Sequence, residues 1–61
     1  MTPERIGRAL GMVSRRAKQK IQDLRGQPGG VRNHRLGRLH AHYTLLYANA
    51  QLALEEYPEP P

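Results

Sequence analysis

Three histidines, His34, His40 and His42, are the side chains of this sequence that could bind a metal ion or transfer a proton. Neighbours on one helix face are three or four residues apart, whereas these histidines are two, six and eight apart. No Asp or Glu stands nearby to complete a set of zinc ligands, and the chain has no cysteine. We therefore expect no metal site and no cofactor.

The chain also lacks a constellation for catalysis. Ser14 is the only serine, and it stands among arginines with no histidine close in sequence. The glycines from Gly26 to Gly30 are not followed by the lysine, or preceded by the strand, of a phosphate-binding loop. We expect a protein that is not an enzyme.

Positive charge is the remaining feature that could bind a ligand, and it is unevenly distributed along the chain. Residues 1–38 hold all ten Lys/Arg against Glu4 and Asp23, a net charge of +8, whereas residues 39–61 hold three Glu and no Lys/Arg, a net charge of −3. Arginine forks onto phosphate and carboxylate, and phosphate backbones favour such charge through counterion release. Nucleic acid is the first candidate polyanion, an acidic protein surface the second and anionic lipid the third; a merely solvated face is the alternative. The side chains expected to bind it are Arg15, Arg16, Lys18, Lys20, Arg25, Arg32, Arg35 and Arg38.

A first helix must carry five of these eight residues. Thr2 suits an N-cap, Pro3 the first helical position, and Glu4 the positive end of the helix dipole. Gly26 stands where a left-handed residue would end the helix, so we predict a helix at about 3–25. Apolar residues recur there in steps of three and four and predict one stripe: Ile6, Leu10, Val13, Ala17, Ile21 and Leu24.

Gly7 and Gly11 interrupt this helix, each at a cost of about 1 kcal/mol relative to alanine. They are four residues apart and form one row with Ser14 and Lys18. Two interpretations stay open: the row lets another backbone approach closely, or the helix is simply weak near its N-terminus.

A turn at 26–32 and a second helix at about 33–57 follow. Gln27-Pro28-Gly29-Gly30 breaks helix and strand alike, and Asn33 is a plausible N-cap. Pro58 disfavours helical backbone at the preceding residue, so residues 58–61 are predicted to form a frayed tail. A heptad pattern runs through Leu36, Leu39, Tyr43, Leu46, Ala50, Ala53 and Tyr57, with His40, Tyr47 and Leu54 beside it.

The predicted fold is therefore all-α, a single small domain built as an antiparallel two-helix hairpin. The second helix offers ten apolar positions against six on the first, so an apolar face is left uncovered. A second copy would cover it in a homodimeric four-helix bundle; a groove on a partner protein and a loosely packed monomer are the alternatives. The expected interface residues are Leu36, Leu39, Tyr43, Leu46, Tyr47, Ala50 and Leu54.

Two functions fit these observations. The first is a small basic protein that binds nucleic acid, or another polyanion, in an accessory or regulatory role. The second is a protein–protein interaction module, an inhibitor, adaptor or assembly subunit, that uses the apolar stripe of the second helix. The N-terminus lacks the apolar core of a signal peptide, and no run is long and apolar enough for a transmembrane segment, so we expect a cytoplasmic protein.

Overall fold

Helix α1 (Pro3–Arg25) begins and ends close to the predicted residues. The computed structural model describes residues 1–61. At the start of α1, the Thr2 hydroxyl accepts a hydrogen bond from the Arg5 amide at 3.2 Å, which satisfies one of the free amides of the first turn. Gly26 caps the helix in right-handed backbone, φ −81° and ψ −8°, and so differs from the left-handed cap predicted there. The chain continues in a tight turn, in which the Gln27 amide donates to the Leu24 carbonyl.

Chain reversal occurs a few residues later. Gly29 and Gly30 have φ angles of 82° and 49°, which only glycine adopts without a steric penalty. One turn of 3-10 helix, η1 (Gly30–Arg32), then leads to Asn33. The side chain of Asn33 accepts hydrogen bonds from the amides of Arg35 at 3.0 Å and Leu36 at 3.3 Å. This double cap fixes the start of α2 (His34–Glu56).

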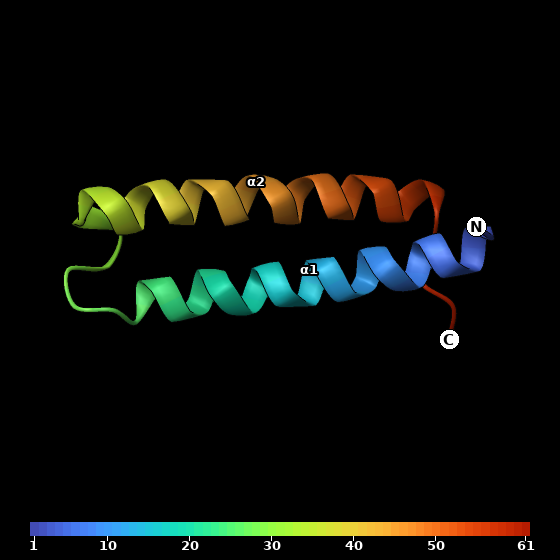
Figure 1. Ribbon diagram of the computed structural model, residues 1–61, viewed down its shortest axis with the longest axis horizontal. Helices are drawn as coiled ribbons and strands as arrows, with labels where there is room; N and C mark the ends of the chain where they lie inside the picture. The colour runs from blue at the N-terminus through green and yellow to red at the C-terminus, as the bar shows by residue number, and fades with distance from the viewer.

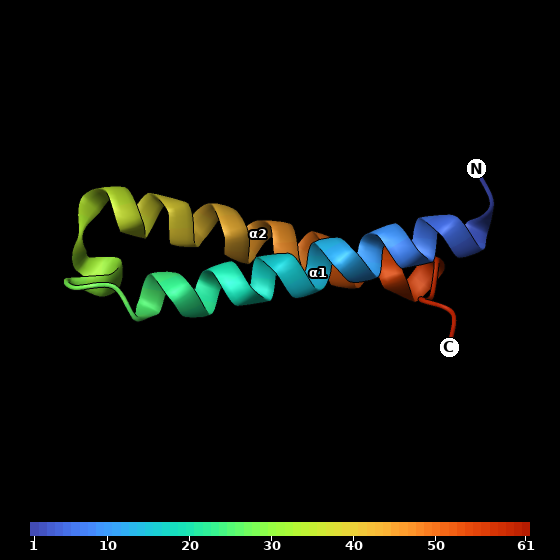
Figure 2. The ribbon, with the colours of Figure 1, turned by 60° about the horizontal axis from the view of Figure 1, so that its bottom comes forward.

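Helices α1 and α2 pack antiparallel and form the predicted hairpin, with no strand. Figure 1 shows them side by side with both chain termini at the open end, and Figure 2 shows that they cross at an angle. The molecule measures 41 × 16 × 16 Å. Neither helix combines the length and the hydrophobicity that a membrane crossing requires.

The buried residues of both helices are small. The buried residues of α1 are Gly7, Gly11, Ser14 and Ala17, and that of α2 is Ala50. Most of the predicted apolar stripe of α1 is half-buried, and Val13 is exposed. The buried face has turned toward the small residues because they allow the closest approach of another segment. No large side chain is fully buried in this hairpin.

The C-terminal tail lies against α1, whereas the sequence predicted a frayed end. A Cβ atom on Gly7 would stand 2.8 Å from the Pro58 carbonyl carbon and 3.0 Å from the Tyr57 carbonyl oxygen. Beyond this crossing, the two carboxylate oxygens of Glu59 accept from Arg15 Nη1 at 2.8 and 2.9 Å. The close approach suggested by the row of small residues is therefore made by the chain's own tail.

Candidate polyanion-binding surface

The hairpin turn gathers four of the predicted basic residues at one end of the molecule. Arg25 ends α1, Arg32 ends η1, and Arg35 and Arg38 lie in the first two turns of α2. All four are exposed. We call Arg25, Arg32, Arg35 and Arg38 the loop-end cluster.

The fold also separates this cluster from most of the acidic side chains. Residues 20–42, the half nearer the turn, carry Lys20 and the four arginines against Asp23, a net charge of +4. The open half, residues 1–19 and 43–61, carries five cationic and four acidic side chains, a net charge of +1. Antiparallel packing produces this difference because it sets the acidic end of α2 beside the basic start of α1 (Figure 1).

The loop-end cluster forms no salt bridge. The only salt bridge of the structure joins Arg15 to Glu59 at the open end. Asp23 accepts instead from the Gln19 amide at 3.0 Å, and Arg25 donates from Nε to His40 Nε2 at 3.3 Å. The guanidinium groups of the cluster are thus charged, exposed and without a carboxylate partner.

The other four predicted basic residues do not join this cluster. Arg15, Arg16, Lys18 and Lys20 are all exposed on α1. At 3.6 residues per turn, Arg16 and Lys18 point about 160° apart around the helix. Arg15 also lies about 15 Å from Arg25 along the axis, at 1.5 Å per residue, and is bound to Glu59. The predicted set is therefore divided into a compact group at the turn and scattered charges along α1.

A shallow groove at the cluster contains two histidines for which the sequence predicted no role. His34, Arg35, Arg38, Leu39 and His42 line it. His34, Arg38 and His42 are successive residues of an i, i+4 row, which puts them on one helix face. That spacing could have revealed the group, because the arginine between the two histidines completes the row.

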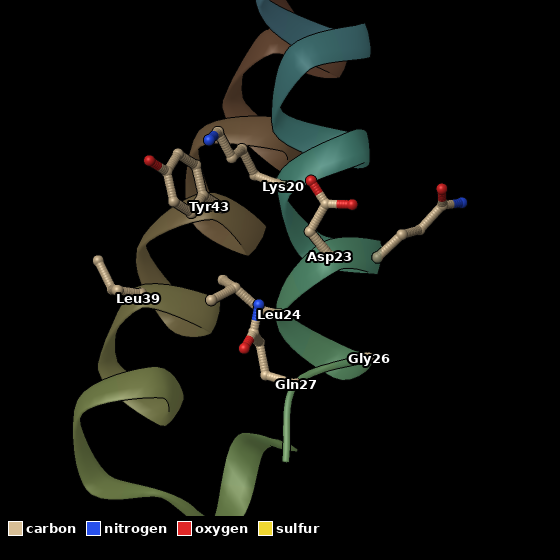
Figure 3. A pocket seen from close by; sticks show the side chains of 8 residues that line it. Lys20, Asp23, Leu24, Gly26, Gln27, Leu39 and Tyr43 are labelled. Atoms are coloured by element: carbon tan, nitrogen blue, oxygen red, sulfur yellow. The ribbon is translucent and has the colours of Figure 1, made fainter. Parts of the chain in front are cut away.

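A second hollow lies between the two helices near the turn. From α1 and the turn it is lined by Lys20, Gln22, Asp23, Leu24, Gly26 and Gln27, and from α2 by Leu39 and Tyr43. Figure 3 shows Lys20 and Tyr43 reaching toward each other across it, with Leu24 and Leu39 nearer the turn. The lining of this hollow is mostly polar, with Leu24 and Leu39 as its aliphatic side chains.

The residues predicted as an oligomer or partner interface belong to the side of α2 that contains buried Ala50. Leu36, Tyr43, Tyr47 and Leu54 are half-buried, and Leu39 and Leu46 remain 37% exposed. Their contact with a second molecule stays a prediction.

Two side-chain hydrogen bonds link α1 to α2 and continue along α2 within the hairpin. Ser14 Oγ donates to Gln51 Oε1 at 3.2 Å, and Gln51 Nε2 donates to the Tyr47 hydroxyl at 3.2 Å. The buried hydroxyl of Ser14 is thereby satisfied, as burial of a polar group requires.

Comparison of the chain with protein-family models, with curated proteins and with solved structures gives no match.

Proposed function

We propose that this protein is a small, basic, non-enzymatic helical protein that binds nucleic acid, or a polyanion of similar charge density, through the loop-end cluster. The observation that carries the proposal is the grouping of Arg25, Arg32, Arg35 and Arg38, exposed and without salt bridges, at one end of the hairpin. Nucleic acid is favoured because its phosphate backbone carries charge at high density and releases counterions on binding, and planar guanidinium groups donate paired hydrogen bonds to its phosphate oxygens.

Binding of this kind derives its free energy from the release of counterions condensed on the phosphate backbone. Contacts to phosphate position a protein but carry no sequence information, so we expect little preference among sequences. The role is accessory or regulatory, and a cytoplasmic location remains part of the proposal.

A homodimer of hairpins, with four helices in all, belongs to the same proposal. What supports it is the absence of any fully buried large side chain in the single hairpin. Chains of this size often gain stability by oligomerisation. A dimer would also carry two loop-end clusters on one particle.

A protein–protein interaction module is the second candidate function. The observation in its favour is the group of exposed leucines on α2, Leu45 and Leu52 among them. On this account the arginines would select an acidic partner, and the affinity would come from apolar burial.

A mobility-shift titration of a short DNA duplex between 50 and 200 mM salt tests the first function. If each of the four cluster arginines neutralises one phosphate, log K falls with log salt at a slope of roughly −3.6, an affinity loss of roughly 100-fold over this range. Absence of binding at 50 mM salt, or binding without salt dependence, would refute the proposal.

A matched pair of variants locates the site. Arg32→Gln/Arg35→Gln removes two charges from the loop-end cluster, and Arg5→Gln/Arg8→Gln removes two exposed charges from the open end. We expect the first to reduce the salt slope by about two units and the second to reduce it by less than half as much. Equal losses would mean that net charge, and not the cluster, determines binding.

A further inference from the structure

The face of α2 opposite α1 carries an exposed apolar row whose residues are not part of the heptad pattern. Ala41, Leu45, Ala48 and Leu52 follow one another in steps of four, three and four. At 100° per residue they lie about 140–180° around the helix from buried Ala50. Leu45 is 63% and Leu52 is 64% exposed. We call these four residues the outer stripe.

When the outer stripes of two copies run antiparallel, small side chains of one stripe face large side chains of the other. Ala41 then faces Leu52 of the second copy, and Leu45 faces Ala48, so that every layer pairs one small and one large side chain. A parallel pair would place leucine on leucine and alanine on alanine, with unequal spacing between the helices. An antiparallel pair is also isologous, as the commonest dimer symmetry requires.

Charge selects the same orientation. The next positions of the row are Arg38 on one side and Glu55 on the other, each three residues beyond the stripe. Antiparallel pairing sets Arg38 of each copy against Glu55 of the other, with Glu56 adjoining, at both ends of the contact. Arg25, Arg32 and Arg35 of each loop-end cluster then remain without a carboxylate partner and can contact phosphate. Parallel pairing would set like charges against each other, which is unfavourable.

The elongated hairpin exposes more surface than a compact monomer of its mass. The accessible surface is 4895 Å² for a mass of 6.9 kDa, whereas a compact monomer of this mass exposes about 4000 Å². The outer stripe is part of this exposed surface.

We propose that a second copy of this chain docks on the outer stripe, α2 against α2 and antiparallel. Because the stripe faces away from α1, the four helices lie in a row, α1–α2–α2–α1, and not around a single square core. This inference specifies the dimer of the proposed function and requires no nucleic acid. The two loop-end clusters then stand at opposite ends of the assembly, about 35 Å apart for a 23-residue helix, close to the ~34 Å of one DNA turn.

Light scattering in the absence of nucleic acid tests the contact. We expect a mass of twice 6.9 kDa for the unaltered chain, and the mass of a single chain for Leu45→Glu, whose dimer dissociation constant should rise roughly 10-fold or more because a carboxylate would be buried in the seam. Met12→Glu is the matched control, since Met12 is equally exposed, at 63%, but lies on α1. Circular dichroism checks that each variant stays helical. A monomeric unaltered chain, a dimeric Leu45→Glu or a monomeric Met12→Glu would overturn the proposal.

A charge exchange tests the orientation. Arg38→Glu should weaken the dimer, because two carboxylates then meet at each end, and Arg38→Glu/Glu55→Arg should restore it. Failure of the double variant to recover the dimer, with its helix content intact, would overturn the antiparallel arrangement. A dimer that binds no DNA would leave this inference standing and refute the nucleic-acid function. A DNA-binding monomer would refute this inference and the homodimer, and would leave the nucleic-acid function standing.

Discussion

At the scale of single residues, Gly7 and Gly11 perform different tasks in the same row of α1. A side chain on Gly7 would meet the backbone of Pro58, which cannot move unless the tail is displaced. A side chain on Gly11 would meet the carboxylate of Glu59, the far end of a flexible side chain. The tail can dock only if residue 7 is glycine, whereas a side chain at residue 11 can be accommodated by movement of the Glu59 side chain.

Alanine substitutions distinguish the two positions. Each gains about 1 kcal/mol of helix propensity, but Gly7→Ala also overpacks the tail contact at roughly 1–3 kcal/mol. Gly11→Ala loses at most the exposed Arg15–Glu59 pair, worth roughly 0.2–1 kcal/mol. We expect Gly11→Ala to be the more stable by roughly 1–2 kcal/mol in urea denaturation at one fixed protein concentration. Equal stabilisation of both variants would contradict docking of the tail at Gly7.

The position of these glycines was predictable, whereas their partner was not. Their spacing shows that they share a face, which is a local property of the helix. The segment that covers them lies about 50 residues later in the chain, and its proline content is typical of a frayed end. Only the packing of α2 brings this tail back across α1.

At the scale of the elements, helix ends were predicted well because their signals are local. Thr2 and Asn33 both accept hydrogen bonds from free amides of the first helical turn. The buried face of α1 was predicted less well, because a hydrophobic pattern gives weight to large residues. The residues that are buried are small instead, Ala17 and Ala50 among them.

Removal of the Asn33 cap tests the start of α2. Asn33 accepts from two amides and lies between the turn and the main packing element. We expect Asn33→Ala to lower the free energy of unfolding by about 1 kcal/mol, within the usual 0.5–2 kcal/mol for a lost N-cap. Thr2→Ala should cost less, because Thr2 binds one amide at a chain end that can fray. Thermal denaturation followed by circular dichroism measures both, and an equal cost would contradict this ranking.

At the scale of the whole molecule, the basic surface was predictable only in part. The turn that separates Arg25 from Arg32, Arg35 and Arg38 had to bring them to one end of any hairpin. The sequence did not reveal that Arg15 binds Glu59, since that pair depends on the path of the tail. The separation of the cluster from the charges along α1 could be predicted, because it follows from the position of the turn.

The central claim about function is that the two ends of the 41 Å axis differ. The proposal places polyanion binding at the loop end, whereas at the open end four acidic side chains offset most of the positive charge. The most direct test is an NMR titration of the labelled protein with a short DNA duplex in low salt. We predict that amide shifts concentrate at Arg25, in residues 30–38 and in the neighbouring groove at His42, while the amides of Thr2 to Arg8 and Tyr57 to Pro61 change little. Shifts concentrated at the open end, or spread evenly along α1, would contradict the account.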